Sequence, residues 1–340
     1  MRVEALLNGA GLEVLRVSKM QRKLGVSALL RRHAGQVRAV AVALVAAAQI
    51  AAAGIVQRAE ALEIVTTTTI LQDLVKQVAG ERATVRSLLR PGMDPHVYQP
   101  VPADLVAVTR ADLIFLHGAG LDPWAVPVAA RGKAPVVTVT EGITDSTTDG
   151  TQPGHVHDHD HEPGGDPHFW LDPNFVRHYV ARIEEGLAAV DPGGAAEYRT
   201  NAARVLAGLA ELDAWIRSRV SEIPPERRKL VTNHDSFGHF ARRYGFEVIG
   251  AVIPSFSPEA EPSARQVAEL ARAVKEAGVP VIFTETTANP RLAEAVAREA
   301  GTGVRVVSLY TGSLSAPGGP ASTYMEFMRF NVNAIVDALK

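Results

Sequence analysis

Three histidines of this chain stand in distinctive local sequences. His96 lies in Gly-Met-Asp-Pro-His-Val-Tyr-Gln-Pro, His168 in Asp-Pro-His-Phe-Trp-Leu-Asp-Pro, and His234 in Thr-Asn-His-Asp-Ser-Phe-Gly. Imidazole nitrogens suit Zn²⁺, Cu²⁺ and Ni²⁺ far better than Ca²⁺ or Mg²⁺. A lone histidine beside a proline is more often a surface or capping residue. Because Asp-Pro-His occurs twice and Asn-His-Asp ends a predicted strand, we predict that the three form a metal site.

Four more histidines alternate along a segment of a different composition. Thr144–Asp166 is rich in Asp, Thr, Gly, Pro and His, so it cannot bury a core and is predicted to be a mobile loop. His155, His157, His159 and His161 could bind zinc weakly through alternating imidazoles. The alternative is a solvated, dispensable loop.

The other histidines favour structural roles. His117 ends a predicted strand, and His178 is expected on a helix surface. His239 follows His234 by five residues on a predicted helix, so it should project elsewhere, into the core or to the surface.

The elements that must position these side chains alternate between strand and helix. Such alternation indicates an α/β fold with parallel sheets and helices on both faces, in which ligands bind beyond the carboxyl ends of the strands. The predicted strands are Leu62–Thr68, Val85–Leu89, Leu113–His117, Val136–Val139, Lys229–Thr232, Glu247–Val252, Val281–Thr284 and Val304–Leu309. The predicted helices are Ile70–Ala79, Ala103–Arg110, Ala195–Ile223, Phe237–Tyr244, Ala264–Ala277, Arg291–Ala300 and Tyr324–Leu339.

The longest of these helices divides the chain. Apolar residues recur every three or four positions along Ala195–Ile223, which predicts one amphipathic helix that Pro224 and Pro225 end. We therefore expect an N-terminal α/β lobe over 62–194, with the loop at 144–166, a linking helix over 195–223, and a C-terminal α/β lobe over 224–340.

Composition excludes several classes of function. The 340 residues are 46% hydrophobic and 21% charged, with a formal net charge of −2, which argues against a general nucleic-acid binder. The chain has no cysteine. Disulfides, thiolate metal sites, a cysteine nucleophile and a lipidated cysteine are therefore excluded.

The first 61 residues read as a cleaved signal peptide. Arg31, Arg32 and Arg38 precede the apolar run Ala39–Val56, and Ala-Glu-Ala at 59–61 supplies a small-residue cleavage site. A transmembrane anchor is the alternative, since 18 residues nearly span a bilayer. Met20 is an alternative start to Met1. We expect a soluble periplasmic protein without a lipid anchor.

With these motifs, the chain resembles the substrate-binding proteins of zinc and manganese ABC transporters, the cluster A-I family. Its resemblance to the zinc-uptake branch of that family is the strongest. The matching stretches follow the family order across almost all of the chain after the signal peptide. They are Pro91–Pro100, His117–Trp124, Asp166–Pro173, Val231–Gly245, Val281–Pro290 and Leu309–Asn331.

The resemblance implies two α/β lobes joined by a rigid long helix, with the metal in the cleft between them. His96, His168 and His234 match the family's three nitrogen ligands, and a histidine at the third position favours zinc over manganese. The implied function is high-affinity capture of Zn²⁺ outside the cytoplasm and its delivery to an ABC permease. The implied protein is a monomer without enzymatic activity, and a periplasmic metallochaperone is a second candidate partner.

The fourth ligand is where this sequence departs from the family. Relatives commonly carry Asp in Thr-Asp-Ser-Leu, whereas this chain has Gly312 there. Water completes the site, or a carboxylate moves in, for which Glu285 is the first candidate. The alternative is that Glu285 only hydrogen-bonds a ligand histidine. Weaker candidates are Asp235, Asp122 and Asp172, while Asp94, Asp166 and Asp172 also fit turn residues beside prolines.

Other functions stay open on the sequence alone. A manganese-binding relative, a metal-dependent adhesin and a chaperone without a permease would carry similar sites. A zinc hydrolase would need an open metal position with a general base beside it. The chain has no His-Glu-x-x-His motif, which disfavours that class.

Overall fold

The computed structural model describes residues 61–143, 165–258, 261–301 and 303–340. The predicted signal peptide, apart from Ala61, and the four loop histidines lie outside these ranges. Within them, no helix combines the length and the apolarity that a membrane crossing requires.

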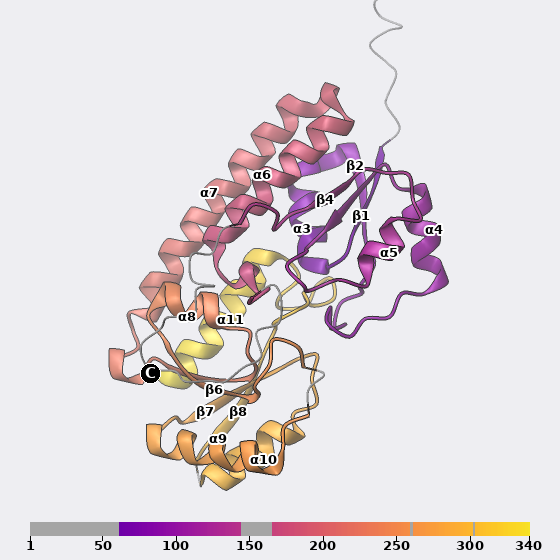
Figure 1. The fold of residues 1–340 in the computed structure, drawn as a ribbon. Coiled ribbons are helices and arrows are strands. Elements are labelled where there is room, and N and C mark those ends of the chain that lie inside the picture. Colours follow the sequence, from indigo (N-terminus) through magenta and orange to yellow (C-terminus); the bar gives the residue numbers. More distant parts are fainter. Residues whose placement is uncertain (1–60, 144–164, 259–260, 302) are drawn as a thin grey trace, which may run out of the picture. The chain divides into compact units, whose positions relative to one another are not determined.

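The described elements alternate between strand and helix, as predicted (Figure 1). The strands are β1 (Leu62–Thr66), β2 (Ala83–Ser87), β3 (Leu113–Leu116), β4 (Val136–Thr138), β5 (Lys229–His234), β6 (Glu247–Ile253), β7 (Val281–Glu285) and β8 (Arg305–Leu309). The helices are α3 (Thr69–Ala79), α4 (Pro102–Arg110), α5 (Ala125–Ala129), α6 (Pro173–Val190), α7 (Ala195–Val220), α8 (Gly238–Tyr244), α9 (Ala264–Ala277), α10 (Arg291–Ala300) and α11 (Tyr324–Leu339). Short 3₁₀ turns cover Gly80–Arg82, Phe169–Leu171, Pro192–Gly194 and Pro225–Arg227.

All strand pairs are parallel, which confirms the predicted fold class. The N-terminal sheet has the order β2-β1-β3-β4, and β5 pairs with β6 and β7 with β8. In β3, Leu113 and Phe115 face one hydrophobic cluster, while Ile114 and Leu116 face another. This alternation buries both faces of the sheet, because helices cover each of them.

The long helix α7 packs against elements of both halves of the described chain. Its buried stripe is Tyr198, Ala202, Val205, Leu209, Leu212, Ile216 and Val220. It contacts α3 and α6 beside the N-terminal sheet and also α11 beside β8 (Figure 1). At 26 residues it is about 39 Å long. One hydrophobic cluster therefore runs from the N-terminal sheet to the C-terminal strands.

Several predicted boundaries are wrong. The long helix ends at Val220 and not at Ile223, because the residue before a proline is disfavoured in the helical region and the chain leaves the helix through a turn. The second strand begins and ends two residues earlier than Val85–Leu89. The prediction placed His178 on a helix but gave no bounds for α6, which Asp172 caps and Pro173 begins.

Candidate metal centre

The three predicted histidines converge on one point. Nε2 of His168 lies 3.2 Å from Nε2 of His96 and 3.1 Å from Nε2 of His234. Two ligands at the usual Zn–N distance of about 2.0–2.1 Å around a tetrahedral ion are about 3.3 Å apart. The spacing of these nitrogens therefore fits a single small metal ion. Among the residues that the structure describes, this is the one group of three or more candidate ligands.

The three ligand candidates lie in segments of different local structure: a strand end, a loop and the start of a 3₁₀ turn. His234 is the last residue of β5, where a parallel strand delivers side chains to the ligand-binding edge. His96 follows β2 in a loop where Asp94 Oδ1 accepts the backbone N–H of His96 at 2.9 Å and Trp124 Nε1 donates to the Pro95 carbonyl at 2.8 Å. His168 directly precedes the buried 3₁₀ turn Phe169–Leu171.

Two of the three imidazoles are oriented by carboxylates. His168 Nδ1 donates to Asp166 Oδ1 at 2.7 Å, and His234 Nδ1 donates to Glu285 Oε1. Since Nδ1 carries the proton in each ring, the lone pair of Nε2 faces the centre. The other oxygen of Glu285 accepts from Thr311 Oγ1 at 2.8 Å. Both carboxylate oxygens of Glu285 are therefore engaged.

Burial keeps two of the imidazoles neutral. Burial and the neighbouring His168 lower the pKa of His96 to about 2. Burial and the neighbouring His234 lower the pKa of His168 well below its ordinary value. For His234 burial acts in the same direction, but the Glu285 carboxylate outweighs it and raises the pKa. The same pairing overcomes the effect of burial on Glu285 and lowers its pKa.

Two of the other predicted carboxylates, those of Asp122 and Asp172, have structural partners. Asp122 accepts the backbone N–H groups of His117 and Gly118, each at 2.8 Å. Asp172 caps α6 and pairs with Arg243 at 3.0 Å. The backbone N–H of Asp235 donates to the Ser255 carbonyl at 3.0 Å. The triad includes none of Glu285, Asp235, Asp122 and Asp172.

The remaining histidines within the described ranges bond to main-chain carbonyls. His117 is buried and lies 2.9 Å from Pro167 O, and His239 is buried and lies 2.9 Å from Asp166 O. His178 on α6 reaches Glu141 O at 2.8 Å. Sequence reasoning missed the orienting role of Asp166, which it assigned to a turn. The Asp-x-His spacing is the signal that could have identified it, because Asp166 Oδ1 also accepts the backbone N–H of His168.

Gly312 lies against the His96 loop. A Cβ built at this position would lie 2.7 Å from Pro95 Cδ, closer than real Cβ contacts. Gly312 therefore allows the segment after β8 to approach the residue next to His96.

We expect Gly312→Ala to lower Zn²⁺ affinity by about tenfold, because the added methyl group must displace Pro95 and with it His96. Titration of the purified protein with Zn²⁺ measures the effect. Gly208→Ala is the matched control, since its Cβ would meet only the mobile end of Met325 on α11. If Gly312→Ala binds Zn²⁺ as tightly as Gly208→Ala and the parent, the expected displacement of His96 is contradicted.

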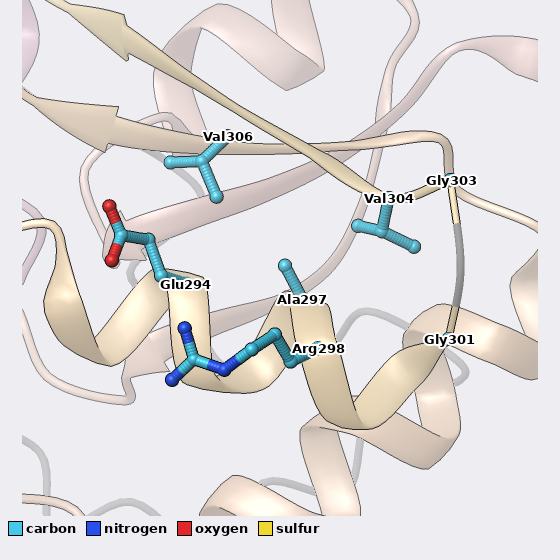
Figure 2. A pocket seen from close by; sticks show the side chains of 7 residues that line it. All are labelled: Glu294, Ala297, Arg298, Gly301, Gly303, Val304 and Val306. Atoms are coloured by element: carbon cyan, nitrogen blue, oxygen red, sulfur yellow. The ribbon is translucent and has the colours of Figure 1, made fainter.

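A separate pocket of about 490 Å³ lies between α10 and the approach to β8 (Figure 2). Ala297, Val304 and Val306 form its apolar lining, with Glu294 and Arg298 on the helix side. It offers one carboxylate and no imidazole, so it is unsuited to binding a transition metal.

Comparison with known proteins shows the family of this chain and relatives that are described as binding metals. The model of the family described as zinc-uptake complex component A, periplasmic, matches residues 64–338. A manganese-binding lipoprotein of Halalkalibacterium halodurans is 34% identical over 281 residues, which cover 82% of this chain and 89% of the relative. An iron-binding protein of Yersinia pestis is 33% identical, covering 82% and 86%. The solved periplasmic zinc-binding protein of Treponema pallidum superimposes with a TM-score of 0.74 at 32% identity, covering 81% of this chain and 98% of that one.

Proposed function

Because this chain belongs to the family of periplasmic zinc-uptake complex component A, we propose that it captures Zn²⁺ and delivers it to an ABC permease. The family consists of solute-binding proteins, so the chain binds a divalent metal for ABC uptake and is not an enzyme. A permease is therefore its partner. The relatives named above are described as binding manganese, iron or zinc, so zinc is our own choice among these metals.

The convergence of three Nε2 atoms is the observation that carries the proposal. We assign His96, His168 and His234 as the metal ligands. We assign Glu285 as the group that orients His234, because its two oxygens already bond to His234 and Thr311. A water molecule then supplies the fourth ligand, since Gly312 has no side chain.

The choice of zinc follows from the donor atoms. Affinity for nitrogen ligands rises from Mn²⁺ toward Zn²⁺, whereas Mn²⁺ is better served by carboxylates and water. Titration of the metal-free protein with each ion tests the proposal, and we expect Zn²⁺ to bind more tightly by several orders of magnitude. Equal affinities, or tighter binding of Mn²⁺, would favour the manganese-binding alternative.

Localisation is a further part of the proposal. We infer export by the predicted signal peptide, with a mature chain that begins at Leu62 and places its two lobes at 62–194 and 224–340. Terminal sequencing of exported material tests the processing step. Retention of Ala39–Val56 would indicate an anchored protein.

A permease and an ATPase encoded beside this chain would favour a role in transport over a role as an adhesin or a chaperone.

Deleting the histidine-rich stretch His155–Glu162 should leave the tight zinc site intact. We expect only weaker additional equivalents to disappear, because a segment of this composition would lose conformational entropy when it chelates, whereas the triad stands on strand and turn ends. The measurement is calorimetric titration of both proteins with Zn²⁺. Loss of the tight equivalent on deletion would show that the loop contributes a ligand.

A further inference from the structure

Two consecutive peptide carbonyls directly before His168 each bond to a buried imidazole. His117, which follows β3, has its Nε2 2.9 Å from the carbonyl of Pro167. His239, on α8, has its Nε2 2.9 Å from the carbonyl of Asp166. A carbonyl oxygen only accepts, so each Nε2 carries a proton and donates it. The two donors are far from this segment in sequence and approach it from different elements.

Packing holds both imidazoles in place. The His239 ring stacks on Phe169 with centroids 4.5 Å apart, and its Nδ1 accepts from Arg242 at 2.6 Å. The His117 ring meets Trp170 and Tyr179 edge to face, at 5.0 and 5.5 Å. Both side chains are at most 2% exposed. Each ring is thus a fixed donor and not a side chain free to follow the backbone.

The backbone of α8 also comes unusually close to Asp166. A Cβ added at Gly238 would lie 2.7 Å from Asp166 Oδ2. Asp166 in turn holds the His168 ring through Oδ1. The position of the His168 ring therefore depends on how firmly residues 166 and 167 are held.

We propose that His117 and His239 are positioning residues that clamp residues 166–167 and so hold His168 ready for the metal. The inference rests on the proposed function, and it gives a role in metal binding to two histidines that are not ligands. The clamp also links His168 to α8, which follows His234 after a short turn. The clamp therefore fixes the position of His168 relative to His234 before any metal binds.

The competing explanation is that these are core histidines whose hydrogen bonds serve only stability. Variants that keep the ring but lose the donor separate the two explanations. His117→Phe and His239→Phe preserve ring contacts with Trp170, Tyr179 and Phe169. His117→Gln and His239→Gln place an amide N–H at about the reach of Nε2, whereas Asn at either position is too short.

Hydrogen bonding of the same kind occurs away from the site and provides the control. His178 Nε2 also meets a main-chain carbonyl, that of Glu141, at 2.8 Å. His178→Phe therefore removes a bond of the same type, here on the surface of α6, in a segment that holds no ligand candidate. The full set is titrated with Zn²⁺ and with Co²⁺, whose visible absorption reports the ligand geometry, and the melting temperature of each metal-free protein is recorded.

We expect each Phe variant at 117 or 239 to bind Zn²⁺ about 10- to 100-fold more weakly and to shift the Co²⁺ spectrum. The Gln variants should bind within about threefold of the parent, and His178→Phe should bind like the parent. In a His168→Ala background the Phe substitutions should have no further effect on affinity, because they act through His168. If a Phe variant does not fold, the Asn and Gln variants at that position provide the test. We expect the Asn variant to bind Zn²⁺ more weakly than the parent and the Gln variant to bind it like the parent.

Parent-like affinity in the Phe or Asn variants would overturn the clamp. The proposal would also be overturned if the Phe substitutions weakened Zn²⁺ binding by the same factor in the His168→Ala background. Gln variants that bind Zn²⁺ as weakly as the Phe variants would overturn it as well. These results would leave the proposed function intact, provided that the parent binds Zn²⁺. A parent protein that binds neither Zn²⁺ nor Co²⁺ would overturn the proposed function and the clamp together.

Discussion

Replacing His234 by alanine is expected to weaken Zn²⁺ binding by about a thousandfold. A structural zinc site contributes about 10–16 kcal/mol in total, so one ligand of three or four accounts for about 4 kcal/mol. The metal-free protein should also lose stability, because the buried Glu285 would lose the partner that offsets the cost of burying its carboxylate. Titration with Zn²⁺ and the melting temperature with and without metal measure the two effects.

A second variant separates the lost ligand from the orphaned carboxylate. His234→Ala combined with Glu285→Gln should recover much of the melting temperature of the metal-free protein and none of the metal affinity. His178→Ala, which removes an imidazole from the α6 surface, should leave the affinity unchanged. Parent-like zinc binding by His234→Ala would show that the assignment of the site is wrong.

The strand and helix pattern was predictable because it depends on local sequence. Runs such as Leu113–Leu116 and Val281–Glu285 are short, apolar and bounded by turn residues, so they read as buried parallel strands. The end of α7 was harder, since Ile223 continues the apolar stripe while Pro224 already excludes the helix. Boundaries of this kind depend on two opposing local effects.

The convergence of His96, His168 and His234 was also predictable, because each is marked by its neighbours in sequence. Glu285 was predicted as the first candidate for a fourth ligand because it should end a strand of the same half as His234, and a hydrogen bond to a ligand histidine was the alternative. The bonds of His117 to Pro167 and of His239 to Asp166 were not predictable, since they join positions 50 and 73 residues apart. Nothing in the local sequence encodes such a pairing, which forms only when β3 and α8 pack against the same segment.

Acidification is expected to weaken Zn²⁺ binding, and Glu285 should set the pH at which this begins. An imidazole binds metal only when the ligating nitrogen is unprotonated. The pKa of His96 is about 2 and that of His168 lies well below 6.5, so neither competes for protons near neutrality. The pKa of His234 is raised above 6.5 by Glu285. Affinity should therefore fall about tenfold per pH unit below the raised pKa of His234, with one proton taken up as the metal leaves.

Replacing Glu285 by glutamine changes both the affinity and its pH dependence. At pH 8 the variant should bind Zn²⁺ about 10- to 100-fold more weakly, because the ligand imidazole loses an anionic partner that raises its basicity. Without that carboxylate, burial dominates and the pKa of His234 should fall, so protons compete only at lower pH. The difference between variant and parent should consequently narrow from pH 8 to pH 5. Competition with a chelator from pH 8 to pH 5 measures the difference in Zn²⁺ affinity between variant and parent. The control is Glu294→Gln, at an exposed position. A constant difference, or a loss of affinity that requires two protons, would mean that the pair of His234 and Glu285 does not control the release of the metal.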